Sequence, residues 1–163
     1  MPKVVSRSVI SASNDQAENA TQQLSLQVYY CCCGEFVLVC DVALSALPRR
    51  PLDGSYVLRC LDSAREEGGR VRRARVFKIN AKQRDPVLLQ RPDGTLERQY
   101  RFYCSRCELP LGYERTPPPL KSGQFTYILQ GALTAVQGRV PPDAFMDLVK
   151  SEPQTGDAEA SFR

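Results

Sequence analysis

Cysteine is the residue type in this chain with the clearest potential for chemistry. The 163-residue sequence contains seven cysteines and no histidine. Four of the cysteines stand in two close pairs, Cys31-x-Cys33 and Cys104-x-x-Cys107, and Gly34 follows the first pair. Zinc takes four deprotonated ligands at tetrahedral corners, and two cysteine pairs on facing turns supply such a set. The spacing therefore predicts one Zn²⁺ ion held by Cys31, Cys33, Cys104 and Cys107.

The predicted zinc is structural, because four thiolates complete the coordination sphere and leave no position for water. A lone Cys-x-x-Cys could instead be a redox pair. No helix pattern begins within Cys104–Cys107 and a second cysteine pair is present, so we favour the metal. Cys32, Cys40 and Cys60 are expected to be free thiols in or near the core, where cysteine packs as a small apolar side chain.

No catalytic motif accompanies the cysteines. Without histidine, the most common general base and the usual partner of a nucleophilic serine or cysteine are missing. The sequence contains neither a phosphate-binding glycine-rich loop nor a nucleophile elbow. We therefore expect a protein that is not an enzyme and has no small-molecule substrate.

Short strands are predicted on both sides of the first cysteine pair. Residues 26–30 alternate in the period of a half-buried strand, with Leu26, Val28 and Tyr30 on one face. The apolar run of residues 36–39 then predicts a buried strand, so the pair would lie in the turn between two strands.

A β-hairpin is predicted to lead into the second pair. Residues 87–89 run into Pro92-Asp93-Gly94, where proline fixes φ and glycine accepts a left-handed conformation. The returning strand, residues 95–103, ends at Cys104. Its predicted inner face contains Leu96, Arg98, Tyr100 and Phe102. Further strands are expected over residues 109–113 and 125–133.

These elements predict a mainly β fold, namely a small zinc-ribbon-like β domain with paired hairpins and disordered tails. The domain is expected over residues 26–135. Residues 1–25 predict a flexible N-terminal arm and residues 136–163 a mostly disordered C-terminal tail, because both are poor in periodic apolar positions.

A basic insertion is predicted over residues 65–85 of the domain. Its arginines Arg70, Arg72, Arg73 and Arg75 follow a Gly-Gly break. Two interpretations stay open: a solvated surface loop, which is the ordinary one, or a loop that faces a polyanion such as RNA. The net charge of +4 is too small to predict nucleic-acid binding by itself.

No targeting or spanning segment is predicted. The N-terminus lacks the apolar core of roughly 7–15 residues that a secretory signal needs. The longest apolar run, residues 36–40, is far below the about 18 residues that span a membrane. We expect a cytoplasmic or nuclear chain, where thiols remain reduced.

Several strings of this sequence resemble the STING ER exit protein family, in the same order over most of residues 1–135. They are Met1–Val9, Val28-Tyr29-Tyr30-Cys31-x-Cys33-Gly34, Leu47-Pro48-x-Arg50-Pro51-x-Asp53, Arg91-Pro92-x-Gly94, Glu97–Arg101, Cys104-x-x-Cys107-x-Leu109-Pro110-Leu111 and Phe125–Ala132. Carried over by position, the family's cysteines fall on Cys31, Cys33, Cys104 and Cys107. Glu108 stands where the family tends to have glycine, so this turn is expected to be made differently.

The resemblance implies a non-enzymatic adaptor that supports exit of membrane cargo from the endoplasmic reticulum. Its partners would be trafficking machinery or the cargo itself, and its location would be peripheral at that membrane. The resemblance also implies an alternative, a spliceosome-associated structural protein that contacts RNA or protein partners in the nucleus. In that case Arg70–Arg84 would face RNA phosphates.

Overall fold

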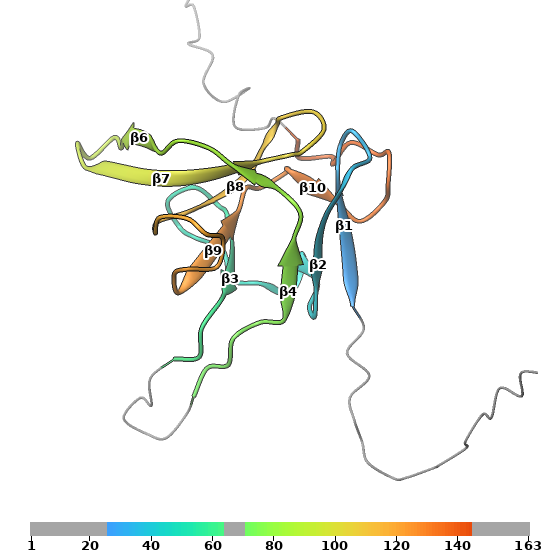
Figure 1. The fold of residues 1–163 in the computed structure, drawn as a ribbon, viewed down its shortest axis with the longest axis horizontal. Helices are drawn as coiled ribbons and strands as arrows, with labels where there is room; N and C mark the ends of the chain where they lie inside the picture. Colours follow the sequence, from blue (N-terminus) through green and yellow to red (C-terminus); the bar gives the residue numbers. More distant parts are fainter. Residues whose placement is uncertain (1–25, 64–70, 145–163) are drawn as a thin grey trace, which may run out of the picture.

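A computed structural model describes residues 26–63 and 71–144 of the chain (Figure 1). Within these ranges the strands are β1 (Gln27–Cys31), β2 (Phe36–Cys40), β3 (Tyr56–Arg59), β4 (Phe77–Ile79), β5 (Lys82–Gln83), β6 (Val87–Gln90), β7 (Leu96–Tyr103), β8 (Pro110–Glu114), β9 (Phe125–Ile128) and β10 (Leu133–Thr134). A short 3-10 helix, η1, covers Leu44–Ala46. The mainly β fold predicted from the sequence is confirmed. The predicted arm over residues 1–25, Arg70, and the predicted tail beyond residue 144 lie outside the described residues.

The strands form two antiparallel sheets, visible in Figure 1 as one group around β1, β2 and β4 and another around β7, β8 and β9. The first sheet has the strand order β10-β1-β2-β4. The second has the order β3-β9-β8-β7-β5, and β6 pairs with β7 at its side. Two hairpins of consecutive strands, β1–β2 and β7–β8, therefore belong to different sheets, and each has one cysteine pair in its turn.

One hydrophobic core joins the sheets. Val37 and Leu38 of the first sheet pack in the same buried cluster as Phe102, Leu111 and Ile128 of the second. All five side chains are fully buried. Each such side chain contributes about 1.5–3 kcal/mol through removal of apolar surface from water, so the cluster holds the two hairpins in a fixed arrangement.

The predicted basic insertion contains two of these strands. β4 pairs with β2 in the first sheet, Leu38 opposite Ile79, and β5 pairs with β7 in the second, Lys82 opposite Tyr103. Residues 77–83 are thus one of the segments by which the chain passes from one sheet to the other. At the C-terminal end of the predicted domain, contacts extend beyond residue 135. Gln137, which lies in the predicted tail, donates a hydrogen bond of 2.9 Å from Nε2 to the carbonyl of Gly34.

The buried face of β1 is opposite to the predicted one. Tyr29 and Cys31 are buried, whereas Val28 is 37% exposed and Leu26, just before the strand, is 59% exposed. Residues two apart on a strand share a face, so Tyr29 turns inward together with Cys31. The Tyr29 hydroxyl then accepts a hydrogen bond of 2.9 Å from the backbone N–H of Leu44, which satisfies both buried groups.

Candidate metal centre

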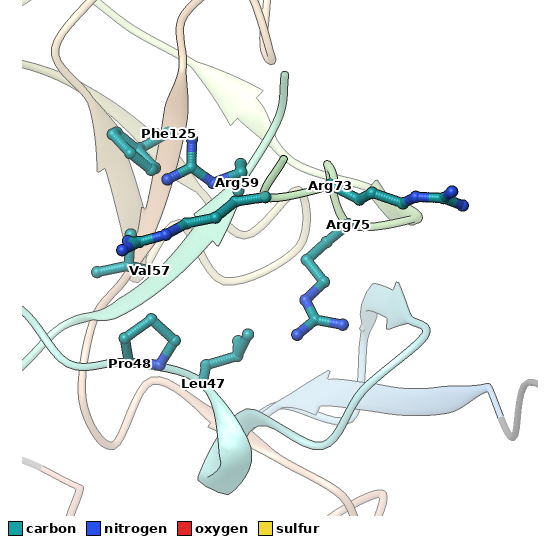
Figure 2. A pocket seen from close by; sticks show the side chains of 8 residues that line it. Leu47, Pro48, Val57, Arg59, Arg73, Arg75 and Phe125 are labelled. Atoms are coloured by element: carbon teal, nitrogen blue, oxygen red, sulfur yellow. The ribbon is translucent and has the colours of Figure 1, made fainter. Parts of the chain in front are cut away.

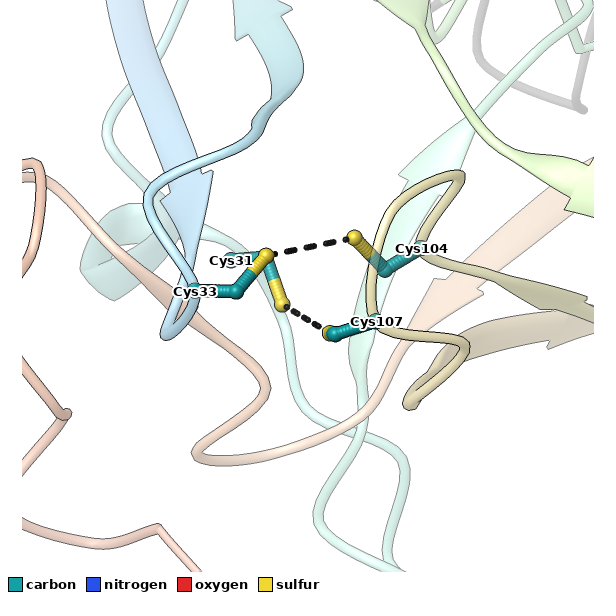
Figure 3. A group of neighbouring side chains, drawn as sticks. All are labelled: Cys31, Cys33, Cys104 and Cys107. Atoms are coloured by element: carbon teal, nitrogen blue, oxygen red, sulfur yellow. Dashed lines mark hydrogen bonds between the residues drawn. The ribbon is translucent and has the colours of Figure 1, made fainter.

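Four cysteines converge where the turns of the two hairpins meet (Figure 3). Their Sγ atoms all lie within 4.8 Å of one another. Sγ of Cys31 is 3.4 Å from Sγ of Cys107, and Sγ of Cys33 is 3.6 Å from Sγ of Cys104. A tetrahedral ion with Zn–S bonds near 2.3 Å places its sulfurs about 3.8 Å apart. The four sulfurs therefore fit one tetrahedral metal ion.

The strands that precede both turns are irregular next to the cysteines. The register of β1 against β2 shifts between Tyr29 and Tyr30, directly before Cys31. The register of β7 against β8 shifts between Phe102 and Tyr103, directly before Cys104. Such irregularities bend a strand and redirect its side chains, which here brings both turns to one point.

Both turns contain a residue in the left-handed conformation. Gly34 has a φ of 84°, and its N–H donates a hydrogen bond of 2.8 Å to the carbonyl of Cys31. Glu108 has a φ of 62°, and its N–H donates a hydrogen bond of 3.1 Å to the carbonyl of Cys104. Glu108 takes the conformation that glycine favours, although its Cβ makes that conformation less favourable. That this turn differs from the family's stays a prediction.

Three side chains bind the backbone of the two turns. Nη1 of Arg106 donates to the carbonyl of Cys33 at 3.2 Å and so links one turn to the other. Nζ of Lys82 donates to the carbonyl of Ser105 at 3.4 Å. The third is Gln137, whose bond to the carbonyl of Gly34 supports the first turn. The sulfur atoms are therefore positioned by contacts outside the cysteines, as is usual for metal ligands.

The four cysteines differ in burial and in the pKa of their thiols. Cys31 and Cys104 are buried, and Cys33 and Cys107 lie nearer the surface. Burial raises the pKa of the Cys31 thiol above its ordinary value. Burial opposes ionisation of Cys104 too, but the backbone groups of Cys107 and Arg106 hydrogen-bond to its sulfur and lower its pKa overall. A bound cation favours the thiolate form of all four ligands.

The comparison with known families agrees with this geometry. A family model described as the STEEP1 domain matches residues 20–143, which include all four cysteines. The chain belongs to the STEEP1 domain family. It is also similar to the STING ER exit protein of Drosophila melanogaster, with 31% identity over 142 residues, 86% of this chain and 52% of that protein. This STEEP1 domain chain thus spans about half the length of the curated relative it matches.

The remaining cysteines of this STEEP1 domain are outside the sulfur cluster. Cys32 is half-buried, with Sγ 3.9 Å from Sγ of Cys31. Cys40 is buried, and Cys60 is half-buried with Sγ 3.2 Å from the Thr126 hydroxyl. All three pack in or against the core, where the sequence placed them. The structure groups the four predicted ligands together, and their binding of a metal stays a prediction.

The predicted polyanion-facing arginines lie elsewhere. Arg72, Arg73 and Arg75 line a cavity beside β3 that has no cysteine in its wall. Arg70 is outside the described residues. A polyanion as their partner stays a prediction. Among the residues that the structure describes, no helix is long and apolar enough to cross a membrane.

A second cluster of functional groups was not predicted. Arg50 and Arg91 both donate to the carboxylate of Glu97, and Arg91 also lies 3.6 Å from the carboxylate of Asp53. The Tyr113 hydroxyl donates to Oδ2 of Asp53 at 2.5 Å. These residues join the loop before β3 to the β6–β7 hairpin. Most of them stand in the strings that resemble the family, so the shared motifs were the available signal for this cluster.

The charges of this cluster shift the ionisation of its members. Hydrogen bonds from Arg50 are the main cause that lowers the pKa of Glu97 to about 2. Burial and the neighbouring Asp53 raise the pKa of Tyr113 to about 12. For Asp53, burial acts against ionisation, but hydrogen bonds from Ser55 and Tyr113 bring its pKa below the ordinary value. The cluster is therefore a set of buried, mutually satisfied charges that holds two segments together.

Proposed function

We propose that this chain is a non-enzymatic adaptor, stabilised by a structural zinc ion, that supports exit of membrane cargo from the endoplasmic reticulum. The observation that carries the proposal is the STEEP1 domain match over residues 20–143. The name of the Drosophila relative refers to exit of STING from this compartment. Because the chain spans about half of that relative, transfer of the whole protein's role to it is part of the proposal.

Zinc is the proposed metal because the donor set consists of four cysteine sulfurs. Cys31, Cys33, Cys104 and Cys107 would hold the ion and leave no open position for water or substrate. Zinc would supply folding energy by joining the two hairpin turns, whose cysteines lie 71 and 76 residues apart in the cross-turn pairs.

The adaptor role rests on two supporting observations. The sequence has no histidine and no catalytic motif, which favours binding over catalysis. The relative's name concerns movement of another protein, which favours protein partners and a peripheral position at the endoplasmic reticulum. Neither that name nor the family description refers to splicing, RNA or the nucleus, so the spliceosome alternative is not carried forward.

The experiment is a rescue assay in Drosophila cells depleted of their STING ER exit protein. We expect this chain to restore movement of tagged STING from the endoplasmic reticulum to the Golgi. Cys104→Ser should abolish the rescue, and Cys32→Ser, which alters a cysteine outside the cluster, should preserve it. No rescue by a folded, metal-loaded chain would contradict the proposed function.

A further inference from the structure

A cavity of about 340 Å³ lies beside β3 and combines apolar and basic walls (Figure 2). Leu47, Val57 and Phe125 supply apolar surface, and Arg59 and Arg75 supply positive charge. Its volume is at the lower end of the range for ligand sites in proteins. None of the charged residues of the Arg50–Glu97 cluster lines it, so it is a separate feature of the domain.

Backbone hydrogen bonds bring the basic stretch to this cavity. The N–H of Arg75 donates to the carbonyl of Arg59 at 2.8 Å, and the N–H of Ser63 donates to the carbonyl of Arg72 at 2.9 Å. The N–H of Ala74 donates to Oδ1 of Asp62 at 2.6 Å. Residues 72–75 therefore run beside the end of β3, and arginines from both segments gather at one place.

Arg59 lies in the cavity wall with an unused donor. Its guanidinium is 4.8 Å from the ring centre of Phe125, and Figure 2 shows the two side chains together at one end of the cavity. Its Nη1 is buried and has no hydrogen-bond partner among the described residues. A buried charged donor without an acceptor is unfavourable, and because Nη1 is closed to solvent, a ligand's carboxylate would pair with it once the guanidinium turns toward the cavity.

Arg75 supplies a second, more accessible charge. Its side chain is 46% exposed and is 4.0 Å from the carboxylate of Asp41, the limit of an ion pair. In Figure 2 its guanidinium extends toward the end of the cavity where Leu47 and Pro48 lie, while Arg73 points away. Arg59 therefore bounds the apolar surface of the cavity at the Phe125 end, and Arg75 bounds it at the Leu47 end.

We propose that this cavity binds a short acidic peptide of a partner protein, with one apolar side chain inserted between Leu47, Val57 and Phe125. Carboxylates next to that side chain pair with Arg59 and Arg75. This inference rests on the proposed adaptor function and states the chemistry of its partner. Apolar anchors in a pocket with complementary charges at the rim are the usual way in which peptides are held.

An RNA strand fits these walls less well. Its bases would need an open aromatic face on which to stack, and Arg59 already covers a face of Phe125. Phosphates would pair with the arginines but would leave the exposed apolar surface of Val57 and Phe125 in contact with water. The charge and the apolar surface together therefore favour a peptide.

The test is selection from a random dodecapeptide display library on the full metal-loaded chain. We expect enriched sequences in which Asp or Glu flanks Phe, Leu or Ile. A fluorescent copy of the best sequence should bind Arg75→Glu about tenfold more weakly than wild type. It should bind Arg98→Glu, an equal charge change on the exposed side of β7, within about twofold of wild type.

Three results would overturn the inference: no enrichment, enrichment without the acidic and apolar pattern, or equal binding by wild type and Arg75→Glu. Displacement of the peptide by a uridine dodecamer at equal concentration would also overturn it and assign the arginines to RNA. Circular dichroism and metal content of each variant establish that it is folded. The rescue assay uses no peptide, so failure of this site is distinguishable from failure of the proposed function.

Discussion

Arg50 donates two parallel hydrogen bonds of 2.8 Å, from Nη1 and Nη2, to the two carboxylate oxygens of Glu97, 47 residues further along the chain. The two side chains are only 12% and 9% exposed. Paired hydrogen bonds between a guanidinium and a carboxylate are the strongest form of ion pair in proteins. This pair fixes the loop before β3 to the start of β7.

Glu97→Gln should destabilise the domain at pH 7 by about 3 kcal/mol, because it leaves the largely buried Arg50 charge with only the longer ion pair of 3.5 Å to Asp53. The pKa of Glu97 is lowered from 4.5 to about 2, so its contribution is complete above about pH 4.5 and is lost as the pH falls toward 2. Urea unfolding at pH 7, 4 and 3 measures the difference between wild type and variant.

That difference should shrink as the pH falls, and the comparison between the two proteins removes the effect of acid on the four clustered cysteines. Asp85→Asn, at an exposed position, is the matched control and should change the free energy of unfolding by less than about 0.5 kcal/mol. A destabilisation by Glu97→Gln that is the same at pH 3 as at pH 7 would contradict the assigned role of the carboxylate.

Local patterns predicted the β6–β7 hairpin and the position of both cysteine turns. The Pro92-Asp93-Gly94 turn was identified from its residues alone, and Gly94 has the expected positive φ of 83°. The grouping of four sulfurs followed from the four ligands that zinc takes, and Cys31 and Cys33 were preferred to Cys32 because residues two apart on a turn can converge. The hairpin and the two turns rest on residues within a few positions of each other, whereas the grouping of the sulfurs joins cysteines 71 and 76 residues apart.

Long-range contacts account for what the sequence did not predict. On β7, the predicted inner face began with Leu96, but Leu96 is 64% exposed, whereas Glu97 and Gln99 are buried. Glu97 faces inward because it pairs with Arg50. The strand expected over residues 125–133 is divided into β9 and β10. Between them Gly131 has a φ of 71°, and a Cβ there would lie 2.4 Å from the carbonyl oxygen of Asp143. Neither contact has a local signal.

Glu108→Gly should stabilise the domain by about 1 kcal/mol, because glycine adopts the left-handed conformation without the steric cost that Glu108 bears at a φ of 62°. The substitution removes an ion pair of 2.6 Å with Arg84, but both side chains are exposed and such pairs contribute little. Thermal unfolding of the variant and of wild type, prepared with the same zinc supplement, measures the change.

Glu108→Ala is the matched control for this turn. It loses the same ion pair and keeps a Cβ, so its melting temperature should equal that of wild type or fall slightly. If the glycine variant were no more stable than the alanine variant, the backbone of Glu108 would not be strained.

The thiols outside the four-cysteine cluster should differ in reactivity. Cys40 is fully buried, and burial raises its pKa to about 11, so little reactive thiolate forms at pH 8. Cys32 is only half-buried, so reagent should reach it more readily than Cys40. Iodoacetamide at pH 8, followed by peptide mass mapping, should label Cys32 and leave Cys40 unmodified until the chain is unfolded. Equal labelling rates in the folded chain would contradict the described packing of β2.

The most direct test of the account is the metal content of purified protein, measured by mass spectrometry for wild type, Cys104→Ser and Cys32→Ser. Wild type and Cys32→Ser should each contain one zinc ion per chain and unfold cooperatively. Cys104→Ser should lose both the ion and the cooperative transition, because an incomplete ligand set cannot join the two hairpins. A folded wild-type chain without metal, or a Cys104→Ser variant that keeps its zinc, would contradict a structural zinc at these four cysteines.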